Sequence, residues 1–239
     1  MNNYKYEEQS GRSMIEMLGV LAIIGVLSVG GIAGYSKAMN KFKTNKVADN
    51  VAMIVTNIRT LYAQQKDYSG LENLSAVQMG VVPDELITAT PKTAKDDGLQ
   101  NAFLGQVVIK ATNVSGLDGE TAAAGGTTGA NRGFLVAMNG LPKEACVTLA
   151  TNDWGSGYSS GLVGISVKGA AQTAAPTGLD ALNCAGSDGK GAKETIACVG
   201  AKAAKDATDP AITTPLNVAK AAAACSASGN TNSIVWVYY

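Results

Sequence analysis

One carboxylate lies at the start of a long stretch that carries no other charge. Glu16 is the only charged side chain between Arg12 and Lys37, and Gly11 precedes it by five residues. A charged side chain inside a membrane-length apolar helix costs roughly 2.5–3.5 kcal/mol on insertion scales, so such a residue usually has a partner and a function. The chemistry open to Glu16 is therefore an ion pair made in an apolar environment.

The composition of the chain argues against most catalytic chemistry. Its 239 residues carry 19 basic and 19 acidic side chains with no dense basic patch, so nucleic acid is not an expected partner. Histidine, the commonest general base and metal ligand, is absent from the sequence. This absence excludes a histidine-dependent triad or zinc site. We predict a protein that is not an enzyme and holds no metal or cofactor.

The remaining polar residues form no recognisable active site. Calcium loops space their carboxylates tightly, whereas one acidic group is loosely spaced: Asp180, Asp188, Asp206 and Asp209. Asp118 and Glu120 lie in a glycine-rich segment without a sign of the apolar pocket that raises a carboxyl pKa. The sequence contains no G-x-S-x-G nucleophile motif. We interpret these residues as solvated loop positions.

The cysteines are the other residues with chemistry of their own: Cys146, Cys184, Cys198 and Cys225. None forms a C-x-x-C pair, which argues against a zinc knuckle or a thioredoxin-like motif. An even, widely spaced set fits two disulfides in an oxidising compartment, and the alternative is four free buried thiols in a cytosolic domain. Spacing alone leaves three pairings open.

An uncharged segment, Met17–Tyr35, follows Glu16 and spans roughly 28 Å as a helix, which is about one membrane hydrocarbon core. Three interpretations fit it. A secretory signal peptide would use Leu18–Val29 as its apolar region and be cleaved after Ala33. A single-pass anchor explains the length but not Glu16. The third interpretation places processing before the apolar run, after Gly11.

The stretch Gly11-Arg12-Ser13-Met14-Ile15-Glu16-Met17-Leu18 resembles the type IV pilin family, which includes the pseudopilins of type II secretion. The resemblance implies that a membrane prepilin peptidase cleaves after Gly11 and frees the amine of Arg12, which the family usually methylates. Glu16 then becomes the fifth residue of the mature chain. In a filament, the amine of one subunit would pair with Glu16 of its neighbour.

Apolar residues recur mostly every three or four positions after Tyr35, through Val47, Ile54 and Ile58. This spacing predicts that one helix runs from Ser13 to about Gln65, apolar all round in its first half and amphipathic in its second. The alternative is two helices hinged near Gly30-Gly31. The predicted fold class is α+β, with the long helix packed on an antiparallel sheet in the lollipop form of the pilin family.

The remaining sequence predicts the elements of a globular head. Strands are expected at Phe103–Ala111, Gly133–Met138, Leu162–Val167 and Ser233–Tyr239, with the last of these forming a bulky sheet edge. Short helices are expected at Glu72–Met79, at Leu141–Thr151 with Pro142 in the first turn, and at Leu216–Cys225 after a Thr214 cap and Pro215. Loops are expected at Ala111–Ala130 and Lys168–Gly186.

The family resemblance implies the remaining assignments. Residues 1–11 would be the prepilin leader, 12–66 the long helix with 14–35 as its membrane and filament-core part, and 67–239 the head. The family's usual C-terminal staple implies a Cys146–Cys225 disulfide, which leaves Cys184 to pair with Cys198. The long head resembles type IVb pilins more than type IVa pilins or pseudopilins.

The function implied is that of a structural subunit that polymerises into a type IV pilus, with adhesion, motility, DNA uptake or conjugation as the uses of such a filament. A minor pilin or a secretion pseudopilin is the alternative within the family, and an exported binding protein or enzyme is the alternative outside it.

The expected partners are copies of the same chain, the prepilin peptidase and the pilus assembly machinery. The chain would wait in the bacterial inner membrane, with its head in the periplasm, and end in an extracellular pilus. Four lysines follow the span on that periplasmic side: Lys37, Lys41, Lys43 and Lys46.

Overall fold

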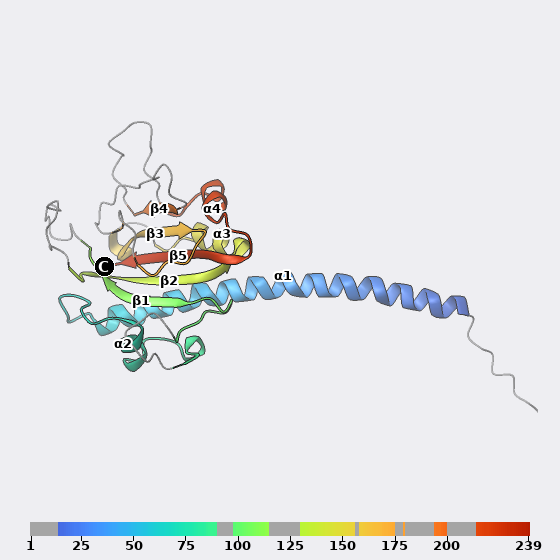
Figure 1. Cartoon of the computed structure of the whole chain (residues 1–239), viewed down its shortest axis with the longest axis horizontal. Coiled ribbons are helices and arrows are strands. Elements are labelled where there is room, and N and C mark those ends of the chain that lie inside the picture. Colours follow the sequence, from blue (N-terminus) through green and yellow to red (C-terminus); the bar gives the residue numbers. More distant parts are fainter. Residues whose placement is uncertain are drawn as a thin grey trace, which may run out of the picture. The chain divides into compact units, whose positions relative to one another are not determined.

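The structure is a computed structural model that describes residues 14–89, 98–114, 130–155, 158–174, 179, 194–199 and 214–239. The helices are α1 (Met14–Leu61), α2 (Asn73–Gln78), α3 (Lys143–Thr151) and α4 (Val218–Ala224), with short 3₁₀ turns at Asp84–Leu86 and Tyr158–Ser160. The strands are β1 (Val107–Thr112), β2 (Gly133–Pro142), β3 (Leu162–Lys168), β4 (Glu194–Cys198) and β5 (Asn230–Tyr238) (Figure 1). The chain divides into two compact units, Met1–Phe42 and Lys43–Tyr239.

The long helix predicted from the apolar spacing is confirmed. α1 contains 48 residues and passes through Gly30 and Gly31 without a break, so the hinged alternative is wrong. It ends at Leu61, a few residues before the predicted end. A Cβ atom added at any glycine from Gly19 to Gly34 would meet nothing within 4 Å. Packing among the described residues therefore does not explain these glycines.

The second unit contains a five-stranded antiparallel sheet in the order β1-β2-β5-β3-β4. The predicted α+β class is confirmed. The prediction that the last strand forms an edge is wrong, because β5 pairs with β2 on one side and β3 on the other. Its run from Ile234 to Tyr238 lacks polar alternation, which is typical of a strand that is buried on both faces.

The two faces of the sheet belong to separate apolar clusters. On one face, the amphipathic half of α1 packs with strand residues such as Phe134 and Trp236, and its buried stripe includes Val47, Val51, Ile54 and Ile58. The other face contributes Leu135, Val163 and Val235 to a second cluster. Full burial of a side chain of this size contributes about 1.5–3 kcal/mol, so the sheet and the second half of α1 stabilise each other.

Buried amides hold an irregularity in β2. The register with β5 shifts between Met138 and Leu141, and Gly140 between them has a φ of 71°. The Asn139 side chain donates to the Gln172 carbonyl at 3.0 Å and accepts from the Gln172 amide at 2.7 Å. The Gln172 side chain in turn donates to Ser233 Oγ at 2.9 Å. These bonds satisfy polar groups at the bulge and attach the segment after β3 to the sheet.

The bulge in β2 also explains why α3 begins later than the predicted Leu141. Leu141 and Pro142 continue β2 and face Asn232 and Asn230 of β5, so Pro142 caps α3 instead of lying in its first turn. β1 begins only at Val107, because a turn precedes it in which Leu104 has a φ of 64°.

α4 begins later than predicted, and β4 was not predicted. The Asn217 side chain accepts a hydrogen bond from the Lys220 amide at 2.8 Å, so the helix begins at Val218. Thr214 and Pro215 therefore do not start it, and Leu216 is buried in the core ahead of the cap. β4 pairs with β3 over five residues that lie in a polar, small-residue region of the sequence.

Aromatic rings connect the end of α1 to the centre of the sheet. Ring centroids are separated by 5.2 Å for Tyr62 and Tyr68, 4.8 Å for Tyr68 and Phe134, and 5.6 Å for Phe134 and Tyr238. Burial raises the pKa of the Tyr238 phenol well above its usual value, and the nearby Arg59 offsets only part of this rise. Tyr238 is thus held neutral within the core.

A disulfide joins the two short helices that follow β2 and precede β5. Cys146 of α3 bonds to Cys225, directly after α4, across 79 residues of sequence. This pairing confirms the one implied by the family resemblance. Cys198 is also disulfide-bonded, whereas Cys184, its expected partner, lies outside the described residues.

Replacing both cysteines of this bridge, as Cys146→Ser/Cys225→Ser, should lower the free energy of unfolding of the head by about 2–4 kcal/mol, because the unfolded chain regains loop entropy. Urea unfolding of the full chain in detergent would measure this through Trp154 and Trp236, which both lie in the head. Ala223→Ser, an exposed change on α4, is the control. An unchanged midpoint for the double variant would contradict the prediction.

Alkaline pH should destabilise the head through Tyr238. Its folded pKa is raised, so the stability that it contributes is fully present below the unfolded value of about 10 and is lost as the pH rises above it. Tyr238→Phe should therefore flatten the dependence of unfolding free energy on pH above that value. Unfolding midpoints at a series of pH values would show this, and parallel curves for the two proteins would refute it.

Candidate assembly surface

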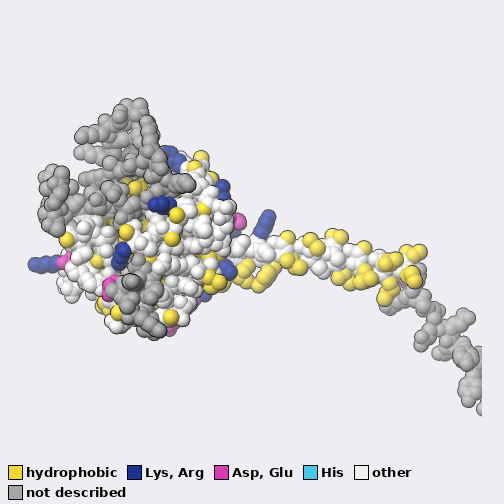
Figure 2. Space-filling model, in the orientation of Figure 1, with side chains coloured by type: hydrophobic (Ala, Val, Ile, Leu, Met, Phe, Trp, Pro, Cys, Tyr) yellow, Lys and Arg dark blue, Asp and Glu magenta, His cyan; other side chains and the backbone are white. Residues whose placement is uncertain are grey.

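The described part of the first unit is an apolar helix without a protein core. From Met14 to Tyr35 its large apolar side chains are exposed, with 80% of Met14, 69% of Leu27 and 65% of Tyr35 accessible. Figure 2 shows hydrophobic side chains along this unit. Within the described residues, α1 is the helix that is long and apolar enough to cross a membrane. This surface requires lipid or other protein to cover it.

Glu16 lies in the first turn of α1 and is exposed. A carboxylate at this position is favoured by the positive end of the helix dipole, which suits an anion there before any partner arrives. Gly11 and Arg12, the two residues predicted to flank the processing site, lie outside the described residues.

The four lysines after the apolar segment differ in their surroundings. Lys43 Nζ lies 5.8 Å from the centroid of the Phe103 ring, a cation–π contact. Lys46 Nζ lies 2.7 Å from Glu85 Oε2, and its hydrogen bond lowers the pKa of the Glu85 carboxyl. Lys37 and Lys41 belong to the first unit and are exposed.

On the head, the outer edge of β1 is covered by a short segment before and within α2. The Asn73 side chain donates to the Val107 carbonyl at 3.0 Å and accepts from the Ile109 amide at 2.7 Å. The Ala111 amide donates to the Leu71 carbonyl at 2.9 Å. An edge strand with open amides and carbonyls is a template for pairing with another chain, so these bonds close that route at β1.

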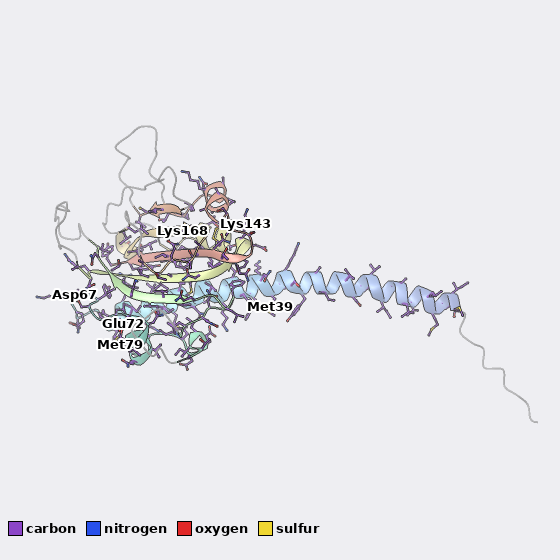
Figure 3. The ribbon with its side chains drawn as sticks, viewed as in Figure 1. Met39, Asp67, Glu72, Met79, Lys143 and Lys168 are labelled. Atoms are coloured by element: carbon purple, nitrogen blue, oxygen red, sulfur yellow. A yellow bond between two sulfur atoms is a disulfide. The ribbon has the colours of Figure 1, made fainter. Side chains whose placement is uncertain are left out.

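A capping box holds Asn73 in place. Glu72, labelled in Figure 3, is the N-cap of α2, and its amide donates to Ser75 Oγ at 2.9 Å. The Ser75 hydroxyl also donates to the Gly70 carbonyl at 2.7 Å. Reciprocal capping of this kind determines where a helix begins, and here it places Asn73, the first residue of α2, against β1.

A groove of about 560 Å³ lies between α1 and the segment after α3 in the head. Its lining includes Asp49 and Thr56 of α1, Asp153 and Trp154 after α3, and Tyr238. The Asp153 side chain accepts from the Gly155 amide at 3.0 Å, so that carboxylate serves a turn. The described residues contain no group of three acidic, cysteine or histidine side chains that could hold a metal ion.

Residues 41–201, more than half of the chain, match the PilS family through its PilS N-terminal region. The chain belongs to the PilS family of type IV pilins. It is also 29% identical over 164 residues to the major structural subunit of the bundle-forming pilus from Escherichia coli O127:H6 (strain E2348/69 / EPEC). That alignment covers 69% of this pilin and 74% of its relative. The subunit of the same name from Escherichia coli O111:H- matches to the same extent.

Two solved pilin structures are also similar to this pilin. The type IV b pilin from Salmonella typhi is 19% identical with a TM-score of 0.44, over 79% of this chain and 94% of that one. TcpA, a type IV pilin from Vibrio cholerae El Tor biotype, is 19% identical with a TM-score of 0.45, over 82% and 99% of the two chains.

The structure brings together some of the residues that the sequence singled out in this pilin. Cys146 and Cys225 are bonded, and Glu16 lies at the start of the exposed apolar helix. Several other positions lie outside the described residues: Asp118, Glu120, Asp180, Cys184, Asp188, Asp206 and Asp209. Sequence reasoning missed Asn73, because nothing in its local pattern distinguishes a side chain that covers a strand edge from a solvated one.

Replacing Asn73 with alanine should destabilise the head by about 2–3 kcal/mol, because a buried strand amide and carbonyl both lose their partner. Urea unfolding of the full chain would measure the change. Asn45→Ala, at an exposed position of α1, is the matched control. A loss no larger than that of the control would contradict the role given to Asn73.

Proposed function

We propose that this pilin is a structural subunit of a type IV pilus, made as a precursor that is cleaved after Gly11 and polymerised through the first unit of α1. The role is structural and not catalytic. The precursor waits in the bacterial inner membrane with its head in the periplasm, and the assembled subunit lies in an extracellular filament.

The observation that carries this proposal is the uncovered apolar helix from Met14 to Tyr35. Its side chains fill no core within the described chain, although each contributes about 1.5–3 kcal/mol when it is fully buried. A membrane covers such a helix before assembly, and the same helices of neighbouring copies cover it afterwards. The bundle-forming pilus subunits to which the chain is similar support the filament as the second environment.

Glu16 gives the assembled helices a register. Apolar helices can slide past one another at little cost, whereas a buried charge without its partner costs about 3–5 kcal/mol. Cleavage after Gly11 creates a new amine at Arg12, four residues before Glu16, which can reach the carboxylate of a neighbouring copy. The five glycines from Gly19 to Gly34 pack against none of the described residues, and their bare surfaces allow helices to approach closely.

The proposed route requires two further partners. A prepilin peptidase in the membrane would remove residues 1–11, and the pilus assembly machinery would move the subunit from lipid into the filament. The long head supports the type IVb subdivision. The surface of the head would determine whether the filament serves adhesion, motility, DNA uptake or conjugation.

Mass spectrometry of the N-terminal peptide from cells tests the processing step. We expect a mature chain that begins at Arg12 and carries one added methyl group. A strain without its prepilin peptidase is the control and should retain residues 1–11. A mature chain beginning at Gly34 would mean signal-peptide cleavage and would overturn the proposal.

Replacing Glu16 tests assembly. Glu16→Ala should reduce the sheared filament fraction at least tenfold, because the amine of each neighbour would be buried unpaired, while the amount of subunit in the membrane stays the same. Ser28→Ala changes a polar side chain in the same segment and is the control. Immunoblots of sheared and membrane fractions give both quantities. Filaments at the normal level in the Glu16 variant would refute the pairing.

A further inference from the structure

The two lysines nearest the apolar segment have no assigned role in the filament. Lys43 and Lys46 contact Phe103 and Glu85 within the head, as described above. Lys37 and Lys41 are exposed, and neither forms an ion pair or hydrogen bond with the described residues. The pair therefore differs from the other two in that its charge has no partner among the residues that the structure describes.

Helix geometry places this pair at the surface of a membrane. With Met14 at the inner boundary of the hydrocarbon core, Lys37 lies about 35 Å and Lys41 about 40 Å further along the axis of α1. The hydrocarbon core is about 30 Å thick, and the whole bilayer is about 40–45 Å thick. Measured from that boundary, the outer head-group layer ends at about 35–37 Å, so Lys37 lies level with it, and the Lys41 side chain, which points back toward the helix N-terminus, can reach it from a few Å beyond.

The aromatic residue beside the lysines suits the same layer. Tyr35 is 65% exposed and lies about 32 Å along the same axis, where hydrocarbon meets head groups and tyrosine is enriched. Lys37 and Lys41 are four residues apart and share one side of α1, roughly opposite Tyr35. A helix that presents a tyrosine ring on one side and two cations on the other can contact acyl chains and phosphates at that boundary.

Topology adds a second argument. Cations close to a span favour the cytoplasmic side, so lysines on the periplasmic side oppose insertion in the required orientation. A favourable contact between these lysines and the head groups of the periplasmic leaflet offsets this cost of insertion. Phosphate is the anion that this layer supplies, and a lysine ammonium is a compact point charge that binds it.

We infer that Lys37 and Lys41, with Tyr35 beside them, form a binding site for anionic phospholipid head groups while the subunit is in the membrane. The inference rests on the membrane stage of the proposed function but not on the filament. The competing partner, a carboxylate of a second copy, is an outcome of the test.

The test uses the full chain reconstituted in phosphatidylcholine vesicles that contain a trace of spin-labelled lipid. Electron paramagnetic resonance gives the fraction of labelled lipid held at the protein, and the comparison is between labelled phosphatidylglycerol and labelled phosphatidylcholine. We expect a preference for phosphatidylglycerol of about fivefold for each lysine at low salt, falling as salt is added. Lys37→Gln/Lys41→Gln should reduce the preference to near one. Lys66→Gln/Lys143→Gln, at exposed positions of the head, should leave it unchanged (Lys143 is labelled in Figure 3).

Equal retention of the two lipids by the unaltered chain would overturn the inference. A preference that survives in the Lys37/Lys41 variant would overturn it as well. Cross-linking between copies that depends on these lysines, in the absence of a lipid preference, would assign the pair to a carboxylate of a second copy and reject the lipid site.

Alkaline carbonate extraction of the same vesicles separates this inference from the proposed function. A chain that stays in the membrane pellet but shows no lipid preference overturns the lipid site alone. A chain released into the supernatant overturns the membrane stage of the proposed function together with the lipid site.

Discussion

α1 must make its backbone hydrogen bonds within the helix in two different surroundings, membrane hydrocarbon and the head of the protein. In hydrocarbon, every amide and carbonyl needs a partner within the chain, and an unbroken helix provides one along its whole length. In the head, the same helix presents one apolar stripe to the sheet and leaves its other side to water. Because both requirements fall on one run of residues, the side-chain pattern changes along α1 while the backbone does not. The proposed register contact at Glu16 and the proposed lipid contact of the lysines after Tyr35 both depend on that continuity.

Three structural features stabilise the head of a subunit that is proposed to lie outside the cell. Both sheet faces are buried, the bridge from Cys146 to Cys225 closes a long loop, and Asn73 occupies the hydrogen-bonding groups on the outer side of β1. The last of these has a particular value for a protein that must polymerise. Heads packed side by side at high local concentration would otherwise be able to join through β1, in competition with association through α1.

Sequence reasoning succeeded where a feature depends on local periodicity and failed where it depends on partners distant in the chain. The spacing of Val47, Ile54 and Ile58 predicted α1, and β-branched runs predicted four of the five strands. The central position of β5 was missed, although the unbroken apolar run through Trp236 was its signal. The start of α4 was wrong because Pro215 follows the usual pattern for a first helical residue, whereas the Asn217 side chain makes the hydrogen bond that caps the helix. For the candidate site, the pattern around Gly11 and Glu16 provided nearly everything, because that site consists of adjacent residues, while Asn73 and Asn139 act through contacts about 35 residues away.

The central position of β5 has a consequence for the proposed route, in which the chain enters the periplasm from its N-terminal side. β5 follows the other strands in the sequence, yet it alone joins the β1–β2 pair to the β3–β4 pair. Until β5 has emerged, the translocated head consists of two separate hairpin-like pieces, and α1 has no finished sheet on which to pack. On that proposed route the membrane segment is delivered well before the head can close, so each nascent subunit would pass through an interval in which it is tethered to the membrane but unfinished. Chaperones or proteases that recognise exposed apolar strands would have that interval in which to act, and the head could close only after β5 had been translocated.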